Sequence, residues 1–176
     1  MDSGGGSSEG GKADGGAVDA SESDVTLPFK LTSSAFMEGG NFPPANTCNA
    51  DMSPDLTWAP GPATTKGYAI VLWDRTNMFR HWALWDIPAT TTSLTANLAK
   101  TATLTNPMGA KQISFRGNGY AGPCPPGGAT DTYEFALYAV DVLPLPGNKG
   151  TAMDAETAII AHQVAKTTLS GRGKAN

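Results

Sequence analysis

The chain has 176 residues, of which 40% are hydrophobic and 16% are charged. This composition fits one folded domain with some tail and excludes a chain that is disordered throughout. The 21 Gly and 13 Pro residues favour a loop-rich β architecture over a helical bundle. The net charge of −4, with 12 Lys and Arg scattered along the chain, argues against a general nucleic-acid binder. No apolar run approaches the roughly 20 residues of a membrane-spanning helix, so no transmembrane segment is expected.

The first 24 residues contain no aromatic residue and a single Val. They are predicted to form a flexible tether, and the folded domain is expected to span residues 25–173. The segment lacks the charged start and apolar stretch of a signal peptide. A leader rich in Gly, Ser and Asp often follows the lipidated cysteine of a bacterial lipoprotein, so we expect Met1 to stand in place of a signal and anchor. The protein is then exported, and is periplasmic or lipid-anchored in the cell envelope; the alternative is a cytoplasmic protein with a low-complexity tail.

The chain has two cysteines, Cys48 and Cys124. Their side chains can form one disulfide, remain two thiols, or bond to other chains. A zinc site is weakly supported because no Cys-x-x-Cys motif and no histidine at ligand spacing accompanies them. A disulfide between them closes a loop of about 75 residues, which stabilises a fold by roughly 4 kcal/mol and requires an oxidising compartment.

Several segments rich in β-forming residues predict strands. Residues 68–74 (YAIVLWD) indicate a buried strand, and residues 81–87 (HWALWDI) indicate a second that ends before Pro88. Residues 132–140 alternate and place Tyr133, Phe135 and Leu137 on one face. Shorter candidates are residues 29–31, 56–58 and 114–115. Strands separated by Pro and Gly turns are typical of a sandwich or barrel.

One helix is predicted near the end of the chain. Thr151 and Asp154 have the spacing of a capping box, although Asp154 could itself be the cap. Met153, Ile160 and Val164 recur at helical spacing and are expected to lie against the sheet. His162 is expected to pack on this helix, and residues 170–176 are expected to fray.

Asp74 ends one predicted strand and His81 opens the next. If the two strands form a hairpin through residues 75–80, both side chains lie at the same end of the sheet. A carboxylate beside an imidazole fixes its tautomer and raises its pKa, which suits a binding site or a general base. The alternative is a surface Asp and a strand-end His that meet only water.

Residues 119–128 (GYAGPCPPGG) contain three prolines and four glycines. Proline fixes φ and glycine permits close backbone approach, so the segment is predicted to be a rigid loop. It is not a phosphate-binding P-loop, because no Gly-Lys-Ser/Thr follows it. By itself the pattern indicates only a connection between strands.

Taken together, these segments resemble the phosphatidylethanolamine-binding family. Residues 53–58 (SPDLTW), Asp74, His81 with the segment 86–89 (DIPA), and residues 119–126 running into Tyr133 occur in the order of that family. The chain looks most like the bacterial Raf-kinase-inhibitor-like branch. Residues 161–165, with Leu169 and Gly171, resemble the family's C-terminal helix. The resemblance spans roughly residues 27–173.

The resemblance implies an all-β fold: a Greek-key β-sandwich with one or two short helices, one of them C-terminal. It also implies a shallow pocket for phosphate-type anions such as phospholipid head groups. The ligand-binding residues carried over by position are Asp74, His81, Gly122, Pro123, Cys124, Pro125 and Tyr133. Bacterial relatives often carry cysteines at the positions of Cys48 and Cys124, which strengthens the disulfide interpretation.

The sequence departs from the family pattern at three places. Only Asp74 remains of the family's Asp-Pro-Asp-Ala-Pro segment, and Gly173 (or Arg172 after a register slip) replaces a tyrosine. Asp131 replaces a second pocket histidine and is included among the candidate ligand-binding residues. A bound anion would then meet like charge costing on the order of 1 kcal/mol or more, unless Arg75, Arg80 or Arg116 compensates. A cationic or neutral polar ligand is therefore favoured over phosphate.

The favoured function is a binding module for a small polar or phosphate-bearing ligand, with no catalytic residue, no cofactor and no metal. The alternative is an inhibitor or other partner-binding protein that contacts a protease or kinase through residues 75–80 and the loop around Pro125. A hydrolase is a third hypothesis, with His81 and Asp74 as base and Cys124 as nucleophile if it is reduced. A variant of it places a divalent metal among Asp74, His81 and Asp131.

Overall fold

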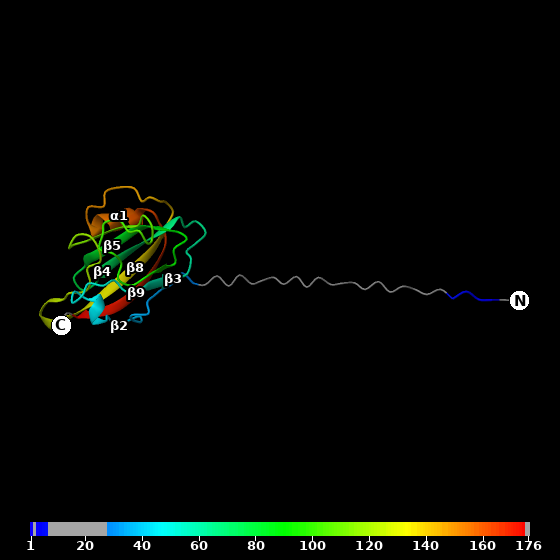
Figure 1. The fold of residues 1–176 in the computed structure, drawn as a ribbon, viewed down its shortest axis with the longest axis horizontal. Helices are drawn as coiled ribbons and strands as arrows, with labels where there is room; N and C mark the ends of the chain where they lie inside the picture. The colour runs from blue at the N-terminus through cyan, green and yellow to red at the C-terminus, as the bar shows by residue number, and fades with distance from the viewer. Residues whose placement is uncertain (2, 7–27, 175–176) are drawn as a thin grey trace.

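Two β-sheets and one α-helix make up the fold (Figure 1) in a computed structural model that describes residues 1, 3–6 and 28–174. The larger sheet has the strand order β2-β9-β8-β4-β5-β7, and the smaller has the order β1-β3-β6. The strands are β1 (Leu31–Thr32), β2 (Gly40–Asn41), β3 (Leu56–Trp58), β4 (Gly67–Asp74), β5 (Phe79–Pro88), β6 (Ser93–Leu94), β7 (Lys111–Ser114), β8 (Thr130–Val140) and β9 (Gln163–Lys174). The helices are α1 (Ala152–Ala161) and two short 3-10 helices, η1 (Pro44–Asn46) and η2 (Pro126–Gly128).

The larger sheet contains a Greek-key path. Strands β4, β5 and β7 are antiparallel neighbours, and the chain then returns by a long connection that places β8 beside β4. The predicted all-β sandwich is therefore confirmed. The predicted strands at residues 68–74, 81–87 and 132–140 correspond to β4, β5 and β8.

Alternation along β8 separates two apolar clusters. Tyr133, Phe135 and Leu137 face the smaller sheet, as predicted, and pack in the core of the sandwich. Residues that alternate with them, such as Ala136 and Tyr138, face the opposite side, where α1 covers the sheet. Figure 1 shows α1 on one side of the larger sheet and β3 on the other. Because β4 and β8 are covered on both faces, they form the rigid centre from which the site is built.

Helix α1 begins as predicted but buries a different face. The hydroxyl of Thr151 accepts a hydrogen bond from the backbone N–H of Asp154 at 3.1 Å, so Thr151 is the N-cap. The prediction that Met153, Ile160 and Val164 lie against the sheet is wrong, because they are 56%, 48% and 37% exposed. The buried side chains are Ala152, Ala155, Glu156 and Ile159, whose spacing is also helical. The small residues Ala152 and Ala155 let the helix approach the sheet closely, whereas Met153 and Ile160 face outward.

The end of the chain is a strand, not the predicted extension of the helix. Residues 161–165 were expected to be helical and residues 170–176 to fray, but β9 pairs with β8 from Gln163 to Lys174. In the second half of β9 every other residue is buried, namely Leu169, Gly171 and Gly173. The period of two was hidden because most inward residues are small or polar. Residues 175–176 lie outside the described residues.

His162 does not pack into the core as expected. Its side chain is about a third exposed, and Nδ1 lies 3.1 Å from Oδ1 of Asp141. The residue therefore closes the turn between α1 and β9 by pairing with Asp141, which directly follows β8.

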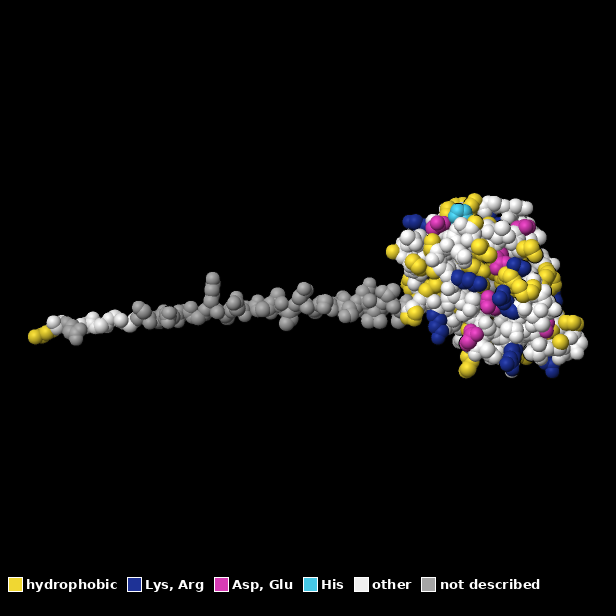
Figure 2. All heavy atoms as spheres, turned by 180° about the vertical axis from the view of Figure 1, so that it is seen from behind, with side chains coloured by type: hydrophobic (Ala, Val, Ile, Leu, Met, Phe, Trp, Pro, Cys, Tyr) yellow, Lys and Arg dark blue, Asp and Glu magenta, His cyan; other side chains and the backbone are white. Residues whose placement is uncertain are grey.

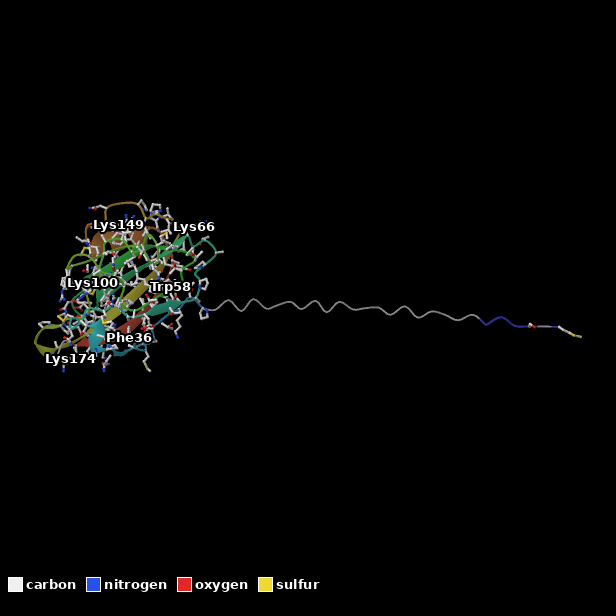
Figure 3. The ribbon with its side chains drawn as sticks, in the orientation of Figure 1. Phe36, Trp58, Lys66, Lys100, Lys149 and Lys174 are labelled. Carbon is white, nitrogen blue, oxygen red and sulfur yellow. A yellow bond between two sulfur atoms is a disulfide. The ribbon has the colours of Figure 1, made fainter. Side chains whose placement is uncertain are left out.

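The predicted tether and domain boundary lie outside the described residues, apart from residues 1 and 3–6. Within the described part of the chain, no helix is both long and apolar enough to cross a membrane. Figure 3 shows Lys66, Lys100, Lys149 and Lys174 at separate places around the domain. On the face in Figure 2, basic, acidic and hydrophobic side chains are interspersed. These positions agree with the scattered charge of the sequence.

Candidate functional site

The β4–β5 hairpin brings Asp74 and His81 together. Asp74 pairs with Phe79 across the hairpin, so the connection is residues 75–78, two residues shorter than predicted. His81 Nε2 lies 4.0 Å from Asp74 Oδ2. The two residues are only 5% and 4% exposed. The alternative of two solvated surface side chains is therefore wrong, and the pair sits at a partly covered rim of the sheet.

The Asp74 carboxylate organises the connection around itself. Oδ1 accepts hydrogen bonds from the backbone N–H groups of Thr76 and Asn77, both at 2.9 Å. Oδ2 accepts a third from the Asn77 side-chain amide, also at 2.9 Å. This arrangement is an Asx turn, which a short carboxylate favours at the first position of a tight connection. It fixes the carboxylate in one orientation toward His81.

Asn77 joins Asp74 to a second carboxylate. Its Nδ2 also donates to Oδ2 of Asp131 at 2.9 Å, so one amide bridges the two acids. Asp131, near the start of β8, is 8% exposed. The structure thus places Asp131 at the rim, where the sequence predicted it. Asn77 was missed, and the only signal for it was an Asp-x-x-Asn pattern within a short hairpin connection.

The three arginines considered as compensating charges pair elsewhere. Arg75 lies 4.0 Å from Glu134, and Arg80 lies 2.7 Å from Glu156. Arg116 lies 2.9 Å from the carboxylate of Asp51. None of the three forms an ion pair with Asp74 or Asp131 in the described part of the chain, so none of them compensates either carboxylate at ion-pair distance.

The loop at residues 119–128 closes over His81 and fixes its tautomer. The carbonyl oxygen of Gly122 lies 3.2 Å from His81 Nδ1. A carbonyl oxygen can only accept, so Nδ1 carries the proton, and the lone pair of the neutral ring is on Nε2, toward Asp74. The geometry therefore presents Nε2 as a hydrogen-bond acceptor at the rim.

The loop is held from behind by the segment that contains Cys48. Gly122 N donates to Asp51 Oδ1 at 2.8 Å, and Cys48 N donates to the carbonyl of Pro123 at 2.9 Å. The predicted disulfide between Cys48 and Cys124 is confirmed in the structure. These three links give a physical basis for the rigidity that the Pro and Gly content indicated.

Burial lowers the pKa of His81 below its ordinary value of 6.5. The neighbouring Asp74 carboxylate and the Gly122 carbonyl oppose this shift but do not outweigh it. The sequence-based expectation of a raised pKa is therefore wrong, because it omitted the loop and rings that cover the imidazole. At neutral pH the ring is uncharged.

This shift predicts the pH dependence of stability. An unfolded chain takes up the imidazole proton near pH 6.5, whereas the folded chain takes it up at a lower pH. The free energy of unfolding is therefore expected to fall as the pH drops below 6.5. The fall is up to about 1.4 kcal/mol per pH unit and ends once the folded chain has also taken up the proton. The measurement is urea unfolding at several pH values between 7.5 and 5. The His81→Asn variant, whose amide can still donate to Gly122, is expected to show a smaller loss; an equal loss would contradict the assignment to His81.

Three aromatic rings surround the imidazole. The ring centroids of Phe79, Phe115 and Tyr133 lie 5.4, 5.0 and 5.1 Å from that of His81, all edge-to-face. The pKa of Tyr133 is raised, first by burial and then by the Asp74 carboxylate, so its phenol stays protonated. These three rings form an apolar wall that borders the polar rim.

A groove of about 470 Å³ adjoins this wall. Phe79 and Phe115, which contact His81, also line the groove, together with Arg80, Ser114 and residues 150–153 at the start of α1. Met78, Phe79, Phe115 and Met153 are 57%, 43%, 47% and 56% exposed. We call these four side chains the apolar patch. Exposed large apolar side chains are thus gathered beside the polar rim.

A family model described as phosphatidylethanolamine-binding protein matches residues 32–174. The chain belongs to this family. A UPF0098 protein of Aquifex aeolicus is 33% identical over 120 residues, which are 64% of this chain and 68% of that protein. The protein named "Putative lipoprotein LppC" from Mycobacterium tuberculosis is 29% identical over 182 residues, with 96% of this chain and 86% of that protein covered.

Among solved structures, the crystal structure of Escherichia coli YbcL, described as a new member of the mammalian PEBP family, matches with a TM-score of 0.73. The match covers 85% of this chain and 100% of YbcL at 23% identity, and it shows a shared fold.

The candidate ligand-binding residues carried over from the phosphatidylethanolamine-binding family divide into two groups. Gly122 contacts His81, and the backbone of Cys124 hydrogen-bonds the Tyr133 phenol. Pro123 lies against the Tyr133 side of the loop, where both approach Gly173. Pro125 instead precedes η2 as its N-cap.

The described residues contain no group of three or more His, Cys, Asp and Glu side chains arranged to hold a metal ion. The hypothesis of a divalent metal among Asp74, His81 and Asp131 therefore has no geometric support in that part of the chain.

We predicted that Gly173, or Arg172 after a register slip, replaces a tyrosine of the family pattern, and the packing around residue 173 leaves no room for a side chain. Gly173 lies opposite Asp131 in the β8–β9 pairing. An added Cβ would lie 2.3 Å from Pro123 Cβ and 2.8 Å from Tyr133 Cε2. The absence of a side chain at residue 173 therefore lets the loop pack directly on β9.

The Gly173→Ala variant is expected to lose about 1 to 3 kcal/mol of unfolding free energy, because the methyl group must displace Pro123 or Tyr133. Chemical denaturation of the purified variant measures this loss. Gly150→Ala is the matched control, since a Cβ there would meet nothing closer than 3.7 Å. Equal stability of the two variants would show that the loop yields without cost.

Proposed function

We propose that this member of the phosphatidylethanolamine-binding family is a non-enzymatic binding protein that holds a small polar ligand at the rim formed by Asp74, His81 and Gly122. The observation that carries the proposal is the position of His81 Nε2. The ring is only 5% exposed, its Nδ1 is used by Gly122, and the nearest carboxylate oxygen is 4.0 Å from Nε2, beyond hydrogen-bonding distance. Because Nε2 makes no hydrogen bond to another described residue, it can accept one from a ligand at the rim.

Two further observations support binding over catalysis. The thiol mechanism requires a reduced Cys124, and the structure has this residue bonded to Cys48. The groove beside Phe79 and Phe115 offers room for an apolar part of the ligand, as in a lipid whose head group occupies the rim.

A titration followed by two-dimensional amide NMR at pH 7.5 tests the proposal. The probes are ethanolamine, phosphoethanolamine, inorganic phosphate and choline. We expect at least one of them to shift the signals of His81, Gly122 and Asn77 in a saturable way, and the His81→Asn variant to lose that response. Saturable shifts elsewhere only, or none with any probe, would refute binding at this rim.

We further propose that the protein is exported and resides in the cell envelope. The disulfide favours an oxidising compartment. The similar LppC protein of Mycobacterium tuberculosis is named as a lipoprotein, a class that is attached to the cell envelope. Fractionation of the source cells, with alkylation of the cysteines before lysis, tests this: a protein in the cytoplasmic fraction whose two thiols react would contradict it.

The apolar patch favours a second function, recognition of a protein partner. Such a partner fits the protease or kinase inhibition that the Raf-kinase-inhibitor-like branch implies. Met78 and Phe79 project from the predicted contact surface at residues 75–80 and are 57% and 43% exposed. Cross-linking in cell extracts, with a Met78→Ser and Met153→Ser double variant as comparison, tests this function. Capture that does not depend on these two residues would reject the patch as the contact surface.

A further inference from the structure

We propose that the outer edge of β9, around Lys166 and Thr168, is a docking site for an extended peptide segment of a partner protein, and that this segment carries an acidic side chain. The segment adds a strand to the larger sheet, beside β9 and in line with β2. The site shares no residue with the rim at Asp74 and His81, so the inference goes beyond the proposed binding of a small ligand.

The first observation is the direction of the backbone groups of β9. The carbonyl oxygen of Ser170 accepts a hydrogen bond from the N–H of Gly39 at 2.9 Å, and the N–H of Ser170 donates to Glu38 at 2.8 Å. The backbone groups of Ser170 therefore point away from β8. Because such groups alternate between the two edges of a strand, and the register with β8 is regular over this stretch, those of Lys166 and Thr168 point to the same outer edge.

This outer edge is open along half of the strand. In the described part of the chain β2 is the one strand paired with it, and the register of that pairing covers only Gly171 and Arg172. Proteins often protect an open edge with a lysine. Lys166 does not lie across the edge, because its ammonium group is 5.3 Å from the centroid of the Tyr138 ring, over β8. Within the described residues, the backbone of Lys166 and Thr168 is therefore available to a further strand.

A groove of about 660 Å³ lies beside this edge. One wall is formed by residues 167–169 of β9, and the other by residues 30–33 and 36–38. Leu31, Phe36 and Leu169 give it an apolar base. A recess with two walls fits a single extended chain, whereas the edge of a second folded copy would bring its own neighbouring strands against these walls. The groove therefore favours a peptide segment over a second copy of this chain.

The chain itself shows how an extended segment binds to this edge. The Glu38 carboxylate receives the N–H of Ser170, and the parallel pairing of β2 with β9 begins at Gly40. A peptide continues this row of hydrogen bonds toward Lys166, with alternate side chains directed into the groove.

The charges in the groove select among peptides. Its one carboxylate, that of Glu38, is engaged by the N–H of Ser170. Lys30 on the opposite wall is exposed and takes part in none of the ion pairs formed within the described residues. An acidic side chain that enters the groove meets this free ammonium group.

Selection from a displayed library of peptides about seven residues long, enough to span the open edge, tests the proposal without assuming a sequence. Enriched peptides are expected to contain Asp or Glu. The most enriched peptide, made synthetically, is then expected to slow amide hydrogen exchange at Lys166 and Thr168, as followed by NMR. The amides of Thr167 and Leu169 face β8 and are expected to be protected before the peptide is added.

Two variants assign the binding to this edge. Thr168→Pro removes an outward N–H that takes no part in the pairing with β8, so affinity for the enriched peptide is expected to fall about fivefold or more. Lys30→Glu leaves β9 unchanged and is expected to weaken binding by about tenfold. Lys66→Glu is the matched control, because it makes the same charge change at a lysine that lies apart from Phe36 of the groove (Figure 3). Its affinity is expected to equal that of the wild type.

Several results would overturn the proposal. A library that yields no binder, or an enriched peptide that leaves the exchange of Lys166 and Thr168 unchanged, would rule out docking at this edge. Equal affinity of wild type and Lys30→Glu would refute the selection of an acidic side chain. A wild-type dimer in sedimentation, converted to a monomer by Thr168→Pro, would assign the edge to a second copy of the chain instead of a peptide.

Discussion

Replacing both Cys48 and Cys124 by serine is expected to lower the free energy of unfolding by about 4 to 5 kcal/mol. The bond joins positions 76 residues apart. In the chain-entropy model, releasing a loop of that length gives the unfolded chain freedom worth about 4.5 kcal/mol at 25 °C. The loss is large compared with the total stability of a small domain, so the midpoint of chemical unfolding is expected to shift strongly. Equilibrium unfolding in guanidinium chloride measures it.

Wild-type protein unfolded under reducing conditions is the matched control, because it lacks the bond but keeps both sulfur atoms. The reduced protein and the double variant are expected to lose similar amounts of stability. A loss below about 1 kcal/mol in both would mean that the unfolded chain is already compact around this loop. A loss in the variant alone would assign the effect to the serine side chains.

The rim is expected to keep its geometry in the folded double variant. Gly122 N still donates to Asp51, and the backbone of residue 48 still donates to the Pro123 carbonyl. The disulfide therefore contributes mainly to stability, whereas the backbone hydrogen bonds position the loop over His81.

The parts of the fold that could be predicted from sequence are those in which large apolar residues carry the pattern. Strand β8 was evident because Tyr133, Phe135 and Leu137 alternate with polar or small residues. Strand β9 was not, because its inward positions include Gly171 and Gly173, which pack against other residues through their lack of a side chain. Burial in β9 is produced by neighbours from elsewhere in the chain, and a local pattern cannot report them.

The site shows the same limit. The proximity of Asp74 and His81 followed from two adjacent strands joined by a short connection, which is local information. The link from Asn77 to Asp131 spans 54 residues and depends on β8 lying beside β4. The pKa direction of His81 depends on the loop that covers it and on Tyr133, so the sequence alone gave the wrong sign.

Helix α1 contains a charged residue that is almost fully buried. Glu156 is 2% exposed, and its carboxylate contacts side chains from three strands. Trp73 Nε1 of β4 donates to it at 2.6 Å, and the Tyr138 hydroxyl of β8 donates at 3.0 Å. Arg80 of β5 pairs with it at 2.7 Å. One carboxylate therefore fastens the helix to three strands of the sheet.

Removal of this carboxylate in Glu156→Ala is expected to cost about 3 kcal/mol, because the Arg80 charge and two polar groups lose their shared acceptor. Arg80 is partly exposed and lies over the Trp73 ring, with its guanidinium carbon 3.5 Å from the centroid, which keeps the loss below that of a fully buried pair. Glu156→Gln retains an acceptor and is expected to fall between wild type and Glu156→Ala. Thermal and chemical unfolding measure the three proteins.

Glu134→Ala is the control, since Glu134 meets Arg75 at 4.0 Å and Lys166 at 3.8 Å near the surface, where ion pairs contribute about 1 kcal/mol or less. A Glu156→Ala variant no less stable than Glu134→Ala would show that apolar packing of Ala155 and Ile159 alone holds the helix. The expected difference would instead establish that a buried charge positions α1. Because Thr151 and Met153 at the start of α1 line the groove beside the rim, the same carboxylate would then also set the shape of that groove.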